Sequence, residues 1–292
     1  MSFEVRWECE VSRTRATAGR VLRAARLRKP LEQYEPTFLD LHAKTAPSTQ
    51  LAVDIFTGDW SSHLPDKLGV VSGSARLFED PRIAAVIDWY GPGIVDARVL
   101  ELGPLEGGHT AMLDQAGAEV LAIESNSQAF LKCLVVKELL DLRRSRFVRG
   151  DFTEYLRSRD HTFDLVLASG VLYHMVDPVG LLELLASASD HLAIWTHYYR
   201  ENLVRALPTS KQFGPASEPY VFDDARYVLH PRQYHEAVGW GGFCGGTETY
   251  AQWMERDDIN DCLTRLGFTD IEVAFDQPEH PNGPSILLMA RR

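Results

Sequence analysis

The middle of the chain alternates short, continuous apolar runs with longer segments in which apolar residues recur at helical spacing. Continuous runs are typical of strands buried on both faces, and the periodic segments are typical of amphipathic helices. The strand-like runs start near residues 99, 120, 147, 163 and 192. The helical patterns fall between them, near 109–117, 127–140, 152–158 and 179–188. From Ala97 onward this alternation predicts an α/β fold with a doubly wound, mainly parallel sheet.

The C-terminal part of the chain continues the same pattern. A helical segment over 255–266 ends at Gly267, and two strand-like runs follow at 271–275 and 286–289. The Pro-containing stretch between these two runs is typical of a turn. These runs predict a pair of strands that completes a seven-stranded sheet.

Residues 1–90 form an N-terminal extension, which we expect to be a helical cap. Helical patterns fall near 12–27, 31–43 and 79–90, and prolines interrupt the rest. Gly91-Pro92-Gly93 then marks the boundary to a domain over 91–292.

Residues 200–250 also depart from the alternation. They are rich in glycine, proline and aromatic residues and show no regular periodicity. A long irregular segment inside a compact domain is usually a functional lid or binding loop. We therefore expect an insertion after the fifth strand that covers the substrate.

A glycine-rich turn follows the first strand, in the sequence E-L-G-P-L-E-G-G over 101–108. Gly103, Gly107 and Gly108 allow a tight turn and a close approach of the backbone to a ligand. In an open α/β sheet this corner between strand and helix is where ligands bind. The pattern is neither the dinucleotide G-x-G-x-x-G nor a P-loop.

The next three strands also end in polar residues. Glu124 closes the second strand, where an acidic residue is placed for ribose hydroxyls. Asp151 follows the third strand and can accept a hydrogen bond from an exocyclic amine. Ser169 ends the fourth strand. Together these residues predict a nucleotide-like ligand at one edge of the sheet.

With these motifs the chain resembles the class I S-adenosylmethionine-dependent methyltransferases. The resemblance rests on the glycine-rich turn, on the strand that ends in Glu124, on Gly150-Asp151, and on F-D-L-V-L-A-S-G-V-L-Y-H over 163–174. It implies a seven-stranded Rossmann-like sheet whose last strand is antiparallel, with S-adenosylmethionine as cofactor and S-adenosylhomocysteine as product.

The resemblance also assigns roles to individual residues. It places Glu101 near the amino-acid end of the cofactor, and it assigns Glu124 to the ribose. Asp151 and Phe152 would meet the adenine. Gly103, Gly107 and Ser169 would complete the cofactor site.

Candidate groups for the acceptor follow the fourth and fifth strands. His174 and His197 are candidate general bases, since an imidazole titrates near neutral pH. Tyr173, Tyr198 and Tyr199 are candidate substrate contacts. Two histidines at the rim favour a hydroxyl acceptor on a sugar, a glycan end or a specialised metabolite. For each histidine a purely structural role stays open.

A metal is not expected. His230 and His235 are five residues apart, so a helix would not present both imidazoles on one face. Asp223 and Asp224 lie nearby and offer oxygen ligands, which keeps magnesium as a minor alternative.

Charge bears on the choice of partner. The chain carries a net charge of −11, although residues 1–30 hold eight basic and three acidic residues. An acidic body argues against a broad nucleic-acid surface, and the basic segment fits a solvated helix. A tRNA-base modifying enzyme and a non-catalytic S-adenosylmethionine-binding protein remain alternatives. A homodimer is possible.

Cysteine usage and hydropathy bear on the compartment. Four scattered cysteines without a C-x-x-C pair fit a reducing cytoplasm. No apolar run is long enough to span a membrane. We therefore expect a cytoplasmic protein.

Overall fold

The structure is a computed structural model that describes residues 42–158, 162–217, 219–239 and 245–292. Residues Ala43–Arg292 form one compact unit. The helix expected over 12–27, most of the one expected over 31–43, and the basic segment at 1–30 lie outside the described residues.

A seven-stranded sheet forms the centre of this unit, in the order β10-β11-β5-β4-β1-β2-β3. The five parallel strands are β1 (Arg98–Leu102), β2 (Glu119–Glu124), β3 (Ser145–Arg149), β4 (Leu165–Ser169) and β5 (His191–His197). β11 (Ser285–Arg291) runs antiparallel both to β5 and to β10 (Asp270–Gln277). The predicted fold class, including the antiparallel last strand, is confirmed.

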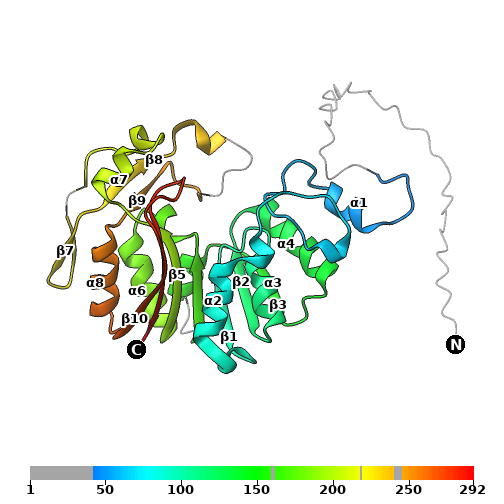
Figure 1. The fold of residues 1–292 in the computed structure, drawn as a ribbon, viewed down its shortest axis with the longest axis horizontal. Coiled ribbons are helices and arrows are strands. Elements are labelled where there is room, and N and C mark those ends of the chain that lie inside the picture. The colour runs from blue at the N-terminus through cyan, green and yellow to red at the C-terminus, as the bar shows by residue number, and fades with distance from the viewer. Residues whose placement is uncertain (1–41, 159–161, 218, 240–244) are drawn as a thin grey trace, which may run out of the picture. The chain divides into compact units, whose positions relative to one another are not determined.

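Helices cover both faces of the sheet, because its strands alternate apolar side chains between two cores. The helices of one face are α2 (Pro81–Tyr90), α3 (Gly108–Gln115) and α4 (Ser127–Leu140). Those of the other face are α5 (Phe152–Ser158), α6 (Pro178–Ala188) and α8 (Arg256–Arg265). Figure 1 shows α6 and α8 together beside β5, with α2, α3 and α4 grouped near β1 and β2.

Capping residues in the sequence explain where several helices begin. Asp80 and Asp177 accept hydrogen bonds from first-turn backbone amides of α2 and α6, and a proline follows each. Asn126 caps α4 in the same way, and Asp141 ends that helix in the left-handed conformation. Such caps satisfy amides that have no partner within the helix.

Residues 43–80 are less helical than the expected cap. They contain the short helix α1 (Thr49–Asp54) and 3₁₀ turns at Asp66–Leu68 and Leu77–Glu79, joined by loops. Phe56, Trp60 and Leu64 are buried in the same core as the inner residues of α2 and α3. This segment therefore belongs to the same compact unit as the sheet.

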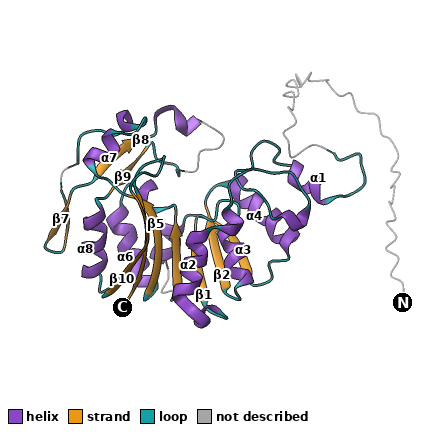
Figure 2. Ribbon diagram, in the orientation of Figure 1, coloured by secondary structure: helices purple, strands orange, loops and turns teal. Residues whose placement is uncertain are grey.

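The insertion after β5 contains regular structure that its sequence did not indicate. A short helix, α7 (Glu201–Arg205), precedes two antiparallel pairs of strands. The pairs are β6 (Tyr220–Phe222) with β7 (Ala225–Tyr227), and β8 (His230–Gln233) with β9 (Tyr250–Trp253). Gln252 fixes β9 to the chain after β4, because its backbone amide donates to the Met175 carbonyl at 2.8 Å. Figure 2 shows β8, β9 and α7 above the end of the sheet.

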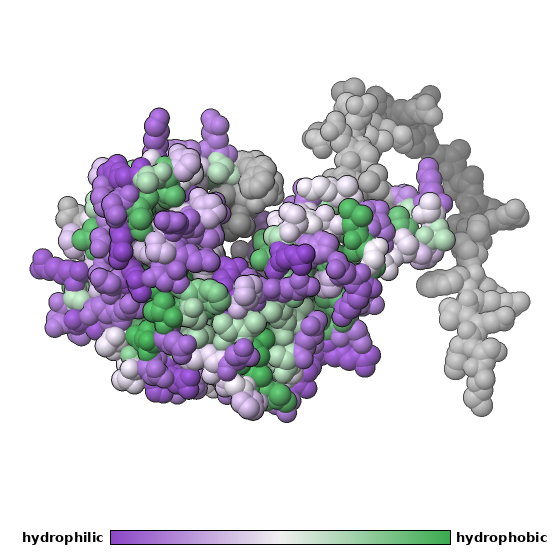
Figure 3. Space-filling model, in the orientation of Figure 1, coloured by the Kyte–Doolittle hydropathy of each residue, from purple (hydrophilic) through white to green (hydrophobic). Residues whose placement is uncertain are grey.

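The surface in Figure 3 mixes hydrophilic and hydrophobic residues. The large apolar side chains that are exposed, among them Ile55, Val71 and Val221, come from separate segments. Within the described residues no helix is both long and apolar enough to cross a membrane.

Candidate functional site

The carboxyl ends of β1 to β4 meet at one edge of the sheet, because these strands are parallel neighbours. This geometry brings Glu101, Glu124, Asp151 and Ser169 to the same edge. The sequence placed them there from spacing alone.

The turn after β1 needs residues in the left-handed conformation. Gly103 has φ 61° and Gly107 has φ 77°, values that a side chain disfavours. A Cβ on Gly107 would also lie 3.0 Å from Phe147 Cζ, whereas a Cβ on Gly103 would meet only Val171 Cγ2, at 3.5 Å. The turn is thus fixed by backbone conformation at Gly103, and by conformation and packing at Gly107.

A glycine is needed at position 108 for a different reason from the one that the sequence suggested. A Cβ there would lie 2.7 Å from the Leu77 carbonyl oxygen. The glycine therefore allows the start of α3 to pack against the N-terminal segment.

Glu101 lies near the end of β1, and only 2% of it is exposed. Its carboxylate accepts a hydrogen bond from the Thr110 hydroxyl on α3. Burial raises the pKa of this carboxyl group. The contact joins β1 to the first turns of α3 across the glycine turn.

Glu124 at the end of β2 holds the glycine turn from the other side. One carboxylate oxygen accepts from the Leu105 amide at 3.1 Å, and the other accepts from the Asn126 amide at 2.8 Å. Burial raises the pKa of Glu124, and these amides oppose that rise. A carboxylate offers about four acceptor sites, so two remain for donors such as ribose hydroxyls.

Asp151 follows β3 and caps α5. Its Oδ1 accepts from the backbone amide of Thr153 at 2.7 Å and from the Thr153 hydroxyl at 2.6 Å. No described residue donates to Oδ2, which leaves an acceptor at the position expected for an amine donor. Phe152 is half-buried against the core beside it.

Glu106 lies in the glycine-rich turn and anchors the N-terminal segment to it. Its fully buried carboxylate accepts from the amides of Ser61 at 3.0 Å and Ser62 at 2.7 Å. It also pairs with Lys132 of α4 at 2.8 Å. This carboxylate is thus used for structure rather than for a ligand.

His197 lies at the end of β5, and only 3% of it is exposed. Its Nδ1 is 2.8 Å from the Gly283 carbonyl oxygen and 3.3 Å from that of Pro284. Carbonyl oxygens only accept, so the neutral ring carries its proton on Nδ1 and an acceptor lone pair on Nε2. Burial and the neighbouring His280 lower the pKa of His197 to about 4.

His174 lies in the 3₁₀ turn after β4, where its Nδ1 is 2.7 Å from the Tyr234 hydroxyl. Burial, with smaller contributions from Arg232 and His197, lowers its pKa to about 3. Both candidate bases are therefore neutral near pH 7 and able to accept a proton.

Aromatic rings connect the two histidines. The Tyr173 ring lies 4.2 Å from that of His174 and 4.6 Å from that of His197, between centroids. Trp253 of β9 stacks on His197 at 5.2 Å, and Trp195 lies edge-on to it at 5.1 Å. The insertion thus supplies one wall of this aromatic group.

Tyr198 and Tyr199 lie apart from that group. Tyr198 is fully buried in the core of the α6 face, and its hydroxyl donates to Asp276 at 3.3 Å. Tyr199 stacks on His230 and donates to Glu201.

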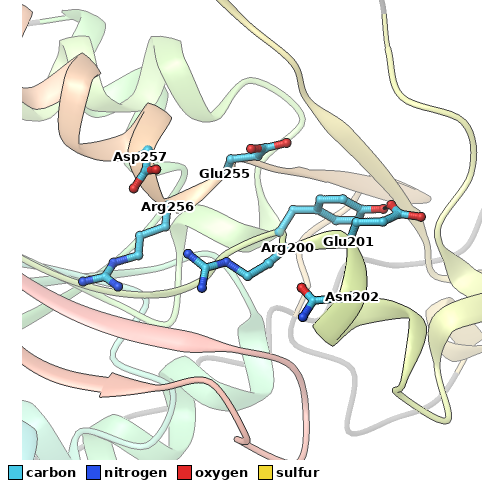
Figure 4. Close-up of a pocket in the computed structure, with 7 residues that line it drawn as sticks. Arg200, Glu201, Asn202, Glu255, Arg256 and Asp257 are labelled. Carbon is cyan, nitrogen blue, oxygen red and sulfur yellow. Dashed lines mark hydrogen bonds between the residues drawn. The ribbon is translucent and has the colours of Figure 1, made fainter.

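A shallow cavity of about 350 Å³ lies near Tyr199, at the start of α7 and α8. In Figure 4 the Arg200 and Arg256 guanidinium groups extend to the left and the Glu201 and Glu255 carboxylates to the right. Its lining includes neither the glycine turn nor the candidate bases, so we do not place the chemistry there.

Three of the residues considered for a metal have other partners. His230 Nε2 is 3.2 Å from Glu255 Oε1, and Asp223 and Asp224 both pair with Arg265. In the described parts of the chain, no group of three or more His, Cys, Asp or Glu side chains is arranged to hold a metal ion.

Known proteins with this architecture carry methyltransferase chemistry. A methyltransferase domain family matches residues 100–187, from β1 to the end of α6. The N-terminal domain of EvdMO1, solved with S-adenosylhomocysteine bound, superposes with a TM-score of 0.61 at 22% identity. It covers 83% of this chain and 94% of that one. Residues 100–187 therefore match a methyltransferase domain, and the fold of the chain is that of a solved protein with S-adenosylhomocysteine bound.

Two further EvdMO1 structures have the same fold. The N-terminal domain solved in the presence of S-adenosylhomocysteine and D-fucose gives a TM-score of 0.60 at 23% identity, with the same coverage. The structure of EvdMO1 itself gives a TM-score of 0.55 at 20% sequence identity. The match covers 83% of this chain and 46% of the EvdMO1 chain. This chain thus spans about half the length of EvdMO1. No curated protein sequence matches it significantly.

The sequence alone did not indicate several of the groups that surround His197. His280 lies between β10 and β11, with its ring 5.1 Å from that of His197. Arg82 of α2 lies 4.2 Å above the Trp195 ring, and Arg232 of β8 lies 5.1 Å from that of Trp253. Only Trp195 had a local signal, since it precedes His197 by two residues and so shares its face of β5.

Proposed function

We propose that this protein transfers a methyl group from S-adenosylmethionine to a hydroxyl oxygen of a small molecule, with His197 as general base. The observation that carries the proposal is the hydrogen bond from His197 Nδ1 to backbone carbonyls. It leaves Nε2 as an acceptor at the carboxyl end of β5, next to the strand ends that fit the cofactor.

The acidic strand ends suit this cofactor in charge and in hydrogen bonding. Glu124 keeps acceptor sites for two ribose hydroxyls, and Asp151 Oδ2 is available to an adenine amine. Glu101 adds a negative charge where the cofactor carries its ammonium and sulfonium groups. Gly103, Gly107, Phe152 and Ser169 complete this proposed site.

When bound, S-adenosylmethionine supplies an electrophilic methyl group whose bonding pair leaves with sulfur. Residues of this chain orient the acceptor, exclude water and take up its proton. As the acceptor oxygen bonds to the methyl carbon, the hydroxyl proton passes to His197 Nε2. Tyr173 and Trp253 form apolar walls, and His174 is a second candidate base.

The test is methyl transfer from isotope-labelled S-adenosylmethionine into a fractionated cell extract. We expect label in small molecules, and we expect His197→Gln to lower the rate by a factor of about 100–10,000, the usual contribution of a positioned base. His191→Gln, at the other end of β5, is the matched control and should retain wild-type transfer. Both variants should bind S-adenosylhomocysteine as the wild type does.

Other outcomes of this assay would support a different function. Label in RNA would favour a tRNA-base modifying enzyme. Cofactor binding without transfer to any fraction would favour a non-catalytic binding protein. An unchanged rate in His197→Gln would remove the proposed base.

A further inference from the structure

Arg232 is a partly buried cation whose described surroundings contain no acidic partner. Its Nε donates to the Gln212 amide oxygen at 3.0 Å, and its guanidinium lies over the Trp253 and Phe213 rings. Burial lowers its pKa, and the charged groups that oppose this effect are the Tyr234 and Tyr173 hydroxyls rather than a carboxylate.

Other partly buried arginines of this protein have a carboxylate partner. Arg82 pairs with Asp80 at 2.5 Å, and Arg256 pairs with Asp276 at 2.7 Å. A charge removed from water is costly unless it is paired. Arg232 differs from both, which indicates that its anion comes from outside the described residues.

A hydrogen-bond donor beside Arg232 lacks an acceptor among the described residues. Trp253 is fully buried, and its Nε1 has no hydrogen-bond partner among the described groups. Ser285 Oγ is likewise buried without a partner, on the residue that pairs with His197 across β11 and β5. Buried polar groups are normally satisfied, so these atoms mark a place for an acceptor-rich ligand or for water.

We propose that the acceptor of this methyltransferase is an acid, whose carboxylate or phosphate group is bound by Arg232 next to Trp253 while its hydroxyl lies at His197. This inference rests on the proposed function and specifies its substrate class. An arginine suits the role because its planar fork of donors matches both kinds of anion.

The same anion would also assist the reaction. The positive charge of Arg232 is one of the causes that lower the pKa of both His174 and His197. An anion bound to Arg232 offsets that charge. The two imidazoles then accept a proton more readily when the acidic acceptor is present.

A binding experiment tests the charge preference without knowledge of the acceptor. The protein is loaded with S-adenosylhomocysteine and titrated with benzoate, or with its neutral counterpart benzamide, at constant ionic strength. Benzoate at ten times its Kd should raise the melting temperature by about 3 °C, and benzamide should leave it unchanged. Arg232→Gln should abolish the benzoate shift, whereas Arg226→Gln, an exposed arginine in the same insertion, should keep it. Equal shifts in wild type and Arg232→Gln, with either benzoate or inorganic phosphate, overturn the proposal.

The labelled product gives an independent readout. In the extract assay we expect the labelled compound to bind an anion exchanger, and we expect Arg232→Gln to lose that label at least tenfold relative to Arg226→Gln. A labelled small molecule that does not bind the exchanger overturns the acidic acceptor and leaves the proposed function standing. No labelled small molecule from any variant overturns the proposed function itself.

Discussion

The two halves of the candidate site are built in different ways. On the cofactor side, each carboxylate has a partner within nine residues of it in sequence: Glu101 has Thr110, Glu124 has Asn126, and Asp151 has Thr153. Leu105, which also donates to Glu124, is 19 residues away. On the acceptor side, His197 is surrounded by groups from β8, β9 and the β10–β11 connection. The first half depends on local spacing and the second on the tertiary fold.

The two halves also differ in charge. The cofactor side presents three carboxylates, whereas the acceptor side presents neutral histidines together with Arg232, which pairs with no described carboxylate. A cationic cofactor and an anionic acceptor would each meet the opposite charge. Substitutions on the acceptor side should therefore leave cofactor binding unchanged, and substitutions on the cofactor side should leave acceptor binding unchanged.

The largest expected effect is on cofactor affinity, from Glu124→Ala. The variant removes the acceptor that we propose for both ribose hydroxyls, and hydrogen bonds to a charged group contribute about 1.5–3 kcal/mol each. We expect affinity for S-adenosylhomocysteine to fall by at least about 100-fold in calorimetry.

Glu119→Ala, at the exposed start of the same strand, is the control and should bind normally. His174→Ala, on the acceptor side, should also bind within a factor of about three of wild type, an effect below 1 kcal/mol. Equal affinities of Glu124→Ala and His174→Ala would mean that the ribose is not bound at Glu124.

The same contrast explains how far the sequence could predict this molecule. The expected helices over 127–140 and 152–158 match α4 and α5, because apolar periodicity and a capping Asn126 or Asp151 specify them locally. The strand ends followed from the same spacing. Arg232 and Trp253 had no such signal, since nothing local says that β8 and β9 pair and pack against β5.

The insertion was harder to predict for a physical reason. Its strands have three or four residues each, too few for an alternating pattern to emerge. Trp253 is buried by contacts with His197 and Tyr173, which are distant in sequence. The 43–80 segment is similar, because Glu106 and Lys132 hold it in place across long separations.

Gly283→Ala should disturb the acceptor side alone. Gly283 has φ 121°, and an added Cβ would lie 2.7 Å from Trp253 Cη2, so Trp253 or the turn must shift. Overpacking of this kind costs about 1–3 kcal/mol of unfolding free energy. We expect slower methyl transfer with unchanged affinity for S-adenosylhomocysteine.

Gly214→Ala is the matched control, since nothing lies within 4 Å of its added Cβ. It should leave both stability and transfer unchanged. A loss of cofactor affinity in Gly283→Ala would show that the two halves are coupled.

The last expected effect is a pH dependence of stability that comes from the acceptor side. The pKa of His174 falls from 6.5 to about 3 and that of His197 from 6.5 to about 4 on folding. At pH values between the folded and the unfolded pKa of each histidine, the unfolded chain binds protons that the folded protein does not. Their contribution to stability is therefore complete above about pH 6.5 and is lost progressively as the pH falls toward 4.

Denaturant unfolding at pH 7.5 and pH 5 measures this loss. The double variant His174→Gln/His197→Gln should lose up to about 4 kcal/mol less than wild type between the two pH values, which is roughly 2 kcal/mol for each imidazole. Burial raises the pKa of Glu101 and Glu124, which acts in the opposite direction, but both proteins contain these groups and the comparison cancels them. His191→Gln should retain the wild-type slope. If the unfolding free energy changed equally with pH in the double variant and in wild type, these imidazoles would be accessible to water in solution. The conclusion that the acceptor side is buried and its histidines neutral would then be wrong.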